Sequence, residues 1–305
     1  MRDLKIIFMG TPEFAVESLK ILVEHNFNIV AVITAPDRPK GRGQKMAFSP
    51  VKEYAIAQNI PVLQPTNLKS PEFNEELKLY NANLQVVVAF RMLPEVVWSM
   101  PEYGTFNLHA SLLPQYRGAA PINWAIMNGE VQTGVTTFFI KHEIDTGSII
   151  LQEKEAINAT DNVGTLYQRL MQKGAKLVLK TVEQVRDQTY KLKFQDESGE
   201  LKHAPKLFKE DLQIDWNRSS KQIYDFVRGL SPYPAAWTEI NGKTYKVFAI
   251  EISRKIIGGN PGSALSNDKD EILIKTQDGA VNLLELQLQG KKRMLTIDFL
   301  RGNTI

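Results

Sequence analysis

The sequence predicts an α/β protein, with a doubly wound, Rossmann-like, mostly parallel sheet followed by a small C-terminal β-barrel that is OB-like. Three observations predict this fold class. The first half alternates short β-branched runs with amphipathic segments. The last third changes to strand-like runs between Gly, Asn and Asp turns. At 305 residues, the chain is also longer than one typical domain.

Five runs predict the strands of the open sheet: LKIIFMG (4–10), NIVAVIT (28–34), IPVLQ (60–64), LQVVVAF (84–90) and GTFNLH (104–109). Helices are predicted between them at 13–26, 51–58, 71–80 and 93–100. Thr11 is the expected N-cap of the first helix, because Pro12 suits its first position. Ligands of such a sheet bind beyond the carboxyl ends of its strands.

The runs TGVTTFFI (133–140) and SIILQEKEAI (148–157) predict a second layer of strands, and a long helix is expected from about 162 to 186. The polar, charged segment that follows predicts a linker. We therefore expect domains at 1–189 and 207–305, with the linker at 190–206. The second domain opens with a predicted helix, SSKQIYDFVRGL.

Composition limits the location of the protein. The chain contains no cysteine, which excludes disulfides and thiolate metal sites and agrees with a reducing cytoplasm. The N-terminal MRDLKIIFMG lacks the features of a signal peptide, and no apolar run has the length needed to cross a bilayer. The sequence predicts a cytoplasmic protein with no membrane partner.

Positive charge is concentrated in two places. Residues 1–205 carry 22 basic and 22 acidic residues, so the whole net charge of +3 lies in the last third. Within the balanced part, one segment carries a single acid, Asp37, and five basic residues: Arg38, Lys40, Arg42, Lys45 and Lys52. This pattern is typical of a surface that binds a polyanion, although a solvated loop has the same composition.

Several common chemistries are disfavoured. The first βα turn, MGTPEF, has one glycine, whereas a dinucleotide fingerprint needs three, and the chain has no Walker lysine motif. The four histidines are not spaced like metal ligands, so no metal is expected.

The end of the fifth strand carries the strongest candidate site. Asn107 and His109 are two residues apart, so they share one face of a strand at the edge where ligands bind. An amide and an imidazole suit an oxygen on which negative charge develops. Asp145, in a predicted turn after 133–140, is placed to approach His109, fix its tautomer and favour its cationic form. The alternative is a structural role, in which these strand-end side chains only form hydrogen bonds with the backbone of the adjacent loop.

The chain resembles the 10-formyltetrahydrofolate-dependent formyltransferases over essentially its full length. The resemblance runs through FMGTPEFA, APDRPKGRGQK, VVVAFRMLP, FNLHASLLPQYRGAAP and DTG, and then APKL, DW, VRGL and AWT. The segment PDRPKGRG and the C-terminal domain indicate the branch that formylates the methionyl group of initiator Met-tRNA. The resemblance implies that Asn107 and protonated His109 stabilise the oxygen of a tetrahedral intermediate, while Asp145 orients His109 and assists proton transfer.

The resemblance also implies the binding residues. The folate site comprises Ser111, Leu112, Leu113, Pro114, Arg91, Met92 and Leu93. The tRNA-binding loop supplies Arg38, Lys40, Arg42 and Lys45, and a weaker contact is expected in the C-terminal domain, from Lys206, Lys209, Lys291, Lys292 and Arg293. The cosubstrate would be 10-formyltetrahydrofolate, without a metal, and a monomer is expected.

Three alternatives remain open at the level of the sequence. In the first, the formyl acceptor is another amine, such as a nucleotide sugar or glycinamide ribonucleotide. In the second, the enzyme hydrolyses the formyl-folate. In the third, the protein is a non-catalytic RNA-binding relative. The segment PDRPKGRGQK and the C-terminal hundred or so residues argue against the first, and intact Asn107, His109 and Asp145 argue against the last.

Overall fold

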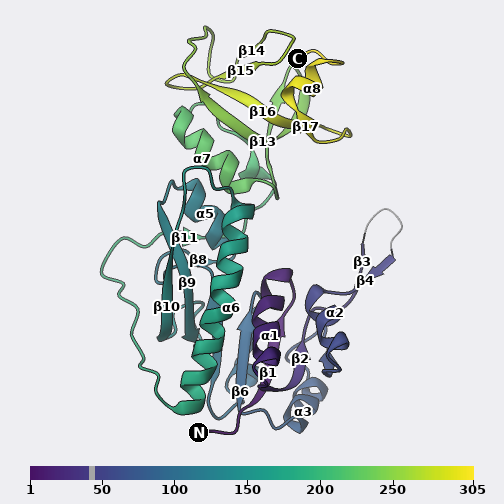
Figure 1. Ribbon diagram of the computed structural model, residues 1–305, viewed down its shortest axis with the longest axis vertical. Coiled ribbons are helices and arrows are strands. Elements are labelled where there is room, and N and C mark those ends of the chain that lie inside the picture. Colours follow the sequence, from purple (N-terminus) through teal and green to yellow (C-terminus); the bar gives the residue numbers. More distant parts are fainter. Residues whose placement is uncertain (41–44) are drawn as a thin grey trace. The chain divides into compact units, whose positions relative to one another are not determined.

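The computed structural model describes residues 1–40 and 45–305 (Figure 1). The chain divides into two compact units, each assembled from separate stretches of sequence. The first comprises Met1–Arg117, Gly134–Glu155 and Gln168–Lys202, and the second comprises Gly118–Thr133, Ala156–Tyr167 and His203–Ile305. The predicted domains are contiguous segments, so these discontinuous units do not test their boundaries, which stay a prediction.

The first unit contains the large sheet and its helices. Its elements are β1 (Lys5–Gly10), α1 (Glu13–Glu24), β2 (Asn28–Ile33), β3 (Arg38–Lys40), β4 (Lys45–Ala47), α2 (Pro50–Ala57), β5 (Val62–Leu63), α3 (Pro71–Leu79), β6 (Leu84–Val88), α4 (Glu95–Trp98) and β7 (Thr105–His109), followed by most of β9 (Gln132–Phe139), β10 (Ile149–Ala156) and α6 (Val163–Asp187). The short strand β8 (Arg117–Gly118) lies where the first unit gives way to the second.

The sheet has the strand order β10-β9-β7-β6-β1-β2-β5. Strand β1 pairs in parallel with β2 and β6, and β6 pairs in parallel with β7. The predicted doubly wound, mostly parallel sheet is therefore confirmed. The prediction of a separate second layer is wrong, because β9 pairs antiparallel with β7 and thereby extends the same sheet.

Both faces of the sheet are covered, which explains why its strands are almost continuously apolar. Ile7 and Met9 of β1 are buried on one face, in a cluster that includes Phe73 of α3 and Val97 of α4. Helix α1 packs against β1, and Gly174 of α6 lies against the Leu108 side chain.

Local sequence signals set the starts of α2 and α3. Ser49 and Ser70 are their N-caps, each followed by proline at the first helical position, and their hydroxyls accept from Lys52 N and Phe73 N. The prediction of Thr11 as the cap of α1 is wrong, because Pro12 is the N-cap residue. The Thr11 hydroxyl instead accepts a hydrogen bond from Ala35 N at 3.3 Å, joining the first turn to the end of β2.

The second unit is built around an antiparallel sheet. Its elements are α5 (Pro121–Met127), β11 (His203–Ala204), a 3-10 turn (Glu210–Leu212), α7 (Ser220–Leu230), β12 (Ala236–Ile240), β13 (Lys243–Ser253), β14 (Ala264–Ser266), β15 (Ile272–Lys275), β16 (Ala280–Leu288), β17 (Met294–Leu295) and α8 (Thr296–Leu300).

The strand order in this sheet is β12-β13-β16-β15-β14, and β17 pairs with β16. The long strands curl into a half-barrel (Figure 1), which confirms the predicted small β domain. Ile223 and Val227 of α7 are buried in one cluster with strand residues such as Val247 and Leu283. A capping box between Ser219 and Gln222 fixes the start of α7. Within the described residues, no helix is long and apolar enough to cross a membrane.

Gly10 allows β1 to approach α1 closely, and this predicts a stability effect. A Cβ at Gly10 would lie 2.6 Å from Ala15 Cβ and 3.1 Å from the Val88 carbonyl oxygen. We expect Gly10→Ala to lower the free energy of unfolding by about 1–3 kcal/mol, because backbone and a short side chain cannot move aside cheaply. Denaturant unfolding followed by circular dichroism measures the change.

Gly199→Ala is the matched control, because no described atom lies within 4 Å of a Cβ at Gly199. Equal stability of both variants would contradict the close packing at Gly10.

Candidate active site

The carboxyl end of β7 holds two of the predicted catalytic residues. Asn107 lies between Val87 of β6 and Phe138 of β9 in the ladder, and His109 lies opposite Thr136. Asn107 is half-buried, whereas His109 is 6% exposed. Because the two residues alternate by two along the strand, their side chains project from the same face.

His109 is hydrogen-bonded through one ring nitrogen and faces a carboxylate with the other. Nε2 lies 2.8 Å from the Tyr116 carbonyl oxygen, and Nδ1 lies 3.8 Å from Asp145 Oδ2. A carbonyl oxygen can only accept, so Nε2 carries the proton of that hydrogen bond. The other ring nitrogen, Nδ1, is directed toward the Asp145 carboxylate.

The turn that carries Asp145 has constrained backbone. Asp145 has φ +56°, in the left-handed region, where a residue with a Cβ is strained. A Cβ at Gly147 would lie 1.6 Å from the Phe139 carbonyl oxygen, so only glycine fits there. The structure therefore brings Asn107 and His109 of β7 together with Asp145 of the turn between β9 and β10, while the assignment of catalytic roles to them stays a prediction.

The predicted folate segment after His109 is bonded mainly within the protein. The buried Ser111 hydroxyl donates to the Gln115 carbonyl oxygen at 2.6 Å, and its own carbonyl accepts from Thr136 Oγ1 at 2.7 Å. Leu113 is buried in a cluster with Phe138 and Ile149. Leu112 and Pro114 are half-buried.

The other predicted folate residues follow β6. Arg91 donates to the carbonyl oxygens of Pro65 and Thr66, the latter at 3.0 Å. Burial and the positive charge of Arg38 lower the pKa of Arg91. Met92 is 76% exposed, whereas Leu93 lies in the core cluster of β1 and α3. Folate contacts by all seven residues stay a prediction.

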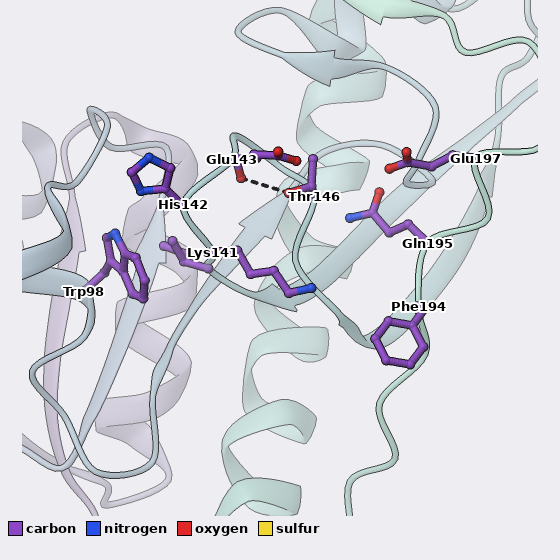
Figure 2. A pocket seen from close by; sticks show the side chains of 9 residues that line it. Trp98, Lys141, His142, Glu143, Thr146, Phe194, Gln195 and Glu197 are labelled. Carbon is purple, nitrogen blue, oxygen red and sulfur yellow. Dashed lines mark hydrogen bonds between the residues drawn. The ribbon is translucent and has the colours of Figure 1, made fainter.

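A cavity of about 580 Å³ opens beside the Asp145 turn (Figure 2). Its apolar lining includes Trp98, Ile140 and Phe194, and its polar lining includes Lys141, Thr146 and Gln195. Sequence reasoning missed these residues. Thr146 could have been found as the neighbour of Asp145, but Phe194 and Gln195 lie in a segment that composition marks only as a linker.

The base of the basic loop is clamped by a hydrogen-bonded network. Lys52 Nζ lies 2.5 Å from Asp37 Oδ2 and 2.7 Å from Gln64 Oε1, and Gln64 Nε2 donates to Asp37 Oδ1 and to the Ala35 carbonyl oxygen, each at 2.8 Å. These hydrogen bonds, that of Lys52 first, hold the pKa of Asp37 below its ordinary value. The charge of Lys52 is thus compensated within the protein.

Three of the four predicted tRNA-binding residues, Arg38, Lys40 and Lys45, lie in the short ladder that follows Asp37 in the chain. Strands β3 and β4 form a two-stranded ribbon in which Arg38 pairs with Ala47 and Lys40 with Lys45 (Figure 1). The Arg38 side chain is exposed. Arg42 lies outside the described residues. Contacts of these four residues with tRNA stay a prediction.

Basic and aromatic side chains meet on the second unit. Lys209 Nζ lies 5.9 Å from the centroid of the Trp237 ring, and Lys206 Nζ lies 5.3 Å from that of Phe208. Arg293 is engaged differently, because two hydrogen bonds of 2.6 Å join it to the Glu285 carboxylate. Lys206 and Lys209 therefore fit an external anion better than Arg293 does.

The remaining histidines have peripheral settings. His142 is exposed at the rim of the cavity, with Nδ1 3.8 Å from Glu95 Oε2, and His25 Nδ1 lies 2.8 Å from the Ile21 carbonyl oxygen of its own helix. His203 is exposed in β11. Within residues 1–40 and 45–305, no group of three or more His, Asp or Glu residues is arranged to hold a metal ion.

Family models match both parts of the chain. Residues 4–182 match the formyl transferase model, and residues 206–304 match the model of the formyl transferase C-terminal domain. The chain therefore belongs to the formyl transferase family.

Relatives within this family include methionyl-tRNA formyltransferases at about half identity. The one from Bacteroides fragilis is 54% identical over 98% of this chain and 95% of its own length. That from Flavobacterium johnsoniae is 51% identical over 100% of this chain and 98% of its own length.

Solved structures share the fold at lower identity. A sugar 3N-formyl transferase solved with dTDP and 5-N-formyl-tetrahydrofolate covers 96% of this chain and 100% of its own, with a TM-score of 0.68 and 21% identity. The methionyl-tRNA formyltransferase from Clostridium thermocellum covers 82% of this chain and 94% of its own, with a TM-score of 0.56 and 16% identity. These likenesses support the two-part fold.

The clamp below the basic loop predicts a titration effect. Because Lys52 favours the ionised form of Asp37, we expect Lys52→Met to raise the pKa of Asp37 toward its ordinary value. In the unchanged protein, this carboxylate adds stability above its unfolded-state pKa, and the contribution is lost as pH falls through the lowered folded pKa. Carboxyl-detected NMR titration of Asp37 measures the shift.

Lys69→Met serves as the control, since Lys69 lies outside the network of Asp37, Lys52 and Gln64. An unchanged Asp37 titration in Lys52→Met would show that the ion pair does not set the pKa of Asp37.

Proposed function

We propose that the protein transfers the formyl group of 10-formyltetrahydrofolate to the amino group of methionyl-tRNA. The single observation that carries the proposal is the approach of Asp145 to His109 beside Asn107, at the end of a central strand in a chain of the formyl transferase family. Relatives at about half identity bear the name of this activity over almost the whole chain.

Asn107 and His109 act on the developing negative charge. Attack of the amine on the formyl carbon moves charge onto the formyl oxygen, and the Asn107 amide is a neutral donor on the face that carries His109. His109 Nε2 is hydrogen-bonded to the Tyr116 carbonyl oxygen, and its Nδ1 faces Asp145 Oδ2 at 3.8 Å. The imidazolium therefore contributes chiefly its positive charge, which is effective because the side chain is almost fully buried.

Asp145 has two duties in this arrangement. Its carboxylate compensates the positive charge of the imidazolium. It also orients the ring, because Nε2 is hydrogen-bonded to the Tyr116 carbonyl oxygen and Nδ1 therefore faces Asp145. Its side chain is 13% exposed, so it retains access to the reacting amine. We assign to it the proton that the amine loses, which passes on toward the leaving nitrogen.

The cavity fits the chemistry of a folate. Its volume of about 580 Å³ lies in the range of small-molecule sites, and Trp98 and Ile140 offer apolar surface to a ring system. Polar groups from Lys141, Thr146 and Gln195 provide orientation. Thr146 directly follows Asp145, so a ligand in this cavity lies next to the catalytic turn. Met92 and the backbone around Arg91 would extend the site.

The tRNA would be held by positive charge at two places. The ribbon of β3 and β4 presents Arg38, and the loop beyond it carries Arg42 in the sequence. On the second unit, Lys206 and Lys209 lie beside aromatic rings, a combination that suits phosphates and exposed bases. Initiator tRNA is the proposed substrate, and a monomer is the proposed form.

The decisive assay combines the purified protein with 10-formyltetrahydrofolate and initiator Met-tRNA. We expect N-formylmethionyl-tRNA from the unchanged protein, whereas His109→Ala should lose about 10²–10³-fold in kcat because a preorganised charge is removed. Affinity for tRNA, measured by filter binding, should stay the same, since His109 is almost fully buried and β7 is separated from β2, the strand before the basic ribbon, by β6 and β1.

Two results would count against this assignment. Formation of free formate or a formylated sugar, without formyl-methionyl product, would contradict the proposed reaction with tRNA. Weakened tRNA binding with normal turnover in His109→Ala would contradict a catalytic role of His109.

The basic ribbon predicts a salt-dependent effect. We expect Arg38→Ala to raise KM for Met-tRNA with little change in kcat, and to reduce the slope of log affinity against log salt by about 0.7–0.9, as the loss of one phosphate contact requires. Lys78→Ala is the control, because Lys78 is an exposed helix residue paired with Glu75. Equal salt slopes for Arg38→Ala and the unchanged protein would exclude a phosphate contact by Arg38.

A further inference from the structure

The segment after α6, residues 188–202, runs along the first unit and is fastened to it at several points. Lys193 and Ile149 exchange two backbone hydrogen bonds of 2.8 and 2.9 Å. Further along, Tyr116 N donates to the Lys202 carbonyl oxygen at 2.6 Å. We call residues 188–202 the strap. Its two fastened ends place the residues between them beside the catalytic turn.

Gln195, in the middle of the strap, binds that turn directly. Its Nε2 donates to the carbonyl oxygens of Asp145 at 2.7 Å and Gly147 at 2.9 Å. Its Oε1 accepts from Arg117 Nε at 3.1 Å and Nη2 at 2.7 Å. All four hydrogen-bonding positions of the amide group are thereby used within the first unit (Figure 2 shows its setting).

Arg117 determines which way the amide points. A guanidinium has only donors, so the atom that faces it must be the amide oxygen. The NH₂ group is consequently directed at the two carbonyl oxygens. A carboxylate in place of the amide would still satisfy Arg117 but would set an oxygen against those carbonyls.

The catalytic turn needs such an external hold. Asp145 lies in the left-handed region, which costs energy in a residue that has a Cβ, and its carboxylate must remain close to His109. Gln195 bonds the carbonyl groups on both sides of Thr146, so it holds the turn by its backbone and leaves the carboxylate exposed to the reacting groups.

We propose that Gln195 is a positioning residue for formyl transfer, holding the backbone of the Asp145 turn so that the Asp145 carboxylate stays against His109. The role rests on the proposed function, because it concerns the same catalytic residues. It extends that function to the segment that composition marks as a linker. Arg117 supports it by orienting the amide.

Two variants test the proposal with two measurements. Gln195→Glu keeps the shape of the side chain and the pairing with Arg117 while removing both donors, and Gln195→Ala removes the whole group. We expect each to lower kcat about 10-fold or more, corresponding to two lost hydrogen bonds, with KM for Met-tRNA unchanged. Hydrogen exchange of the peptide that covers 143–148 should become faster in both. If Gln195→Ala fails to fold, Gln195→Glu alone decides.

Asp196→Asn is the matched control, because Asp196 is exposed on the same strap and its described side-chain hydrogen bonds go only to Ser198. It should leave both kcat and exchange unchanged. Normal kcat in Gln195→Glu overturns the proposal, and so does a lower kcat without faster exchange at 143–148. Absence of formyl transfer in the unchanged protein would instead overturn the proposed function.

Discussion

The antiparallel pairing of β9 with β7 is the constraint on which the site depends. In a purely parallel sheet, the strand next to β7 would run in the same direction, and a crossover connection would have to return the chain to the other end of the sheet first. Here β9 runs back along β7, with Thr136 opposite His109, and ends at Phe139. The turn after β9 brings Asp145 to His109, and it contains a residue in the left-handed region, Asp145, and a glycine, Gly147, that leaves no space for a Cβ.

Most of the hydrogen-bonding capacity around His109 serves to hold the site rather than to face a ligand. Tyr116 takes one ring nitrogen, and Ser111 is bonded to the loop backbone. The hydroxyl of Thr136 donates to the Ser111 carbonyl oxygen and accepts from Leu113 N, so it joins two residues of that loop. Such preorganisation is what electrostatic catalysis requires, because groups that are already fixed do not need to reorient as charge develops.

Charge in the protein is divided between structure and binding. Lys52 and Arg293 are compensated by Asp37 and Glu285, so they strengthen the framework and add little to an external positive field. Arg38 lies in β3, and its positive charge adds to burial in lowering the pKa of Arg91. Two nearby cations repel each other, and an anionic partner would relieve that repulsion.

The sequence by itself determined the alternation of strands and helices and the placement of Asn107 and His109 on one strand face, since each follows from periodicity or from neighbours in the chain. Tertiary structure alone decided that β9 and β10 join the main sheet and that Thr11 bonds Ala35 instead of capping α1. It also decided that Gln195, fifty residues after Asp145, holds the catalytic turn. These outcomes depend on which distant backbone groups meet, and short-range patterns carry no information about such contacts.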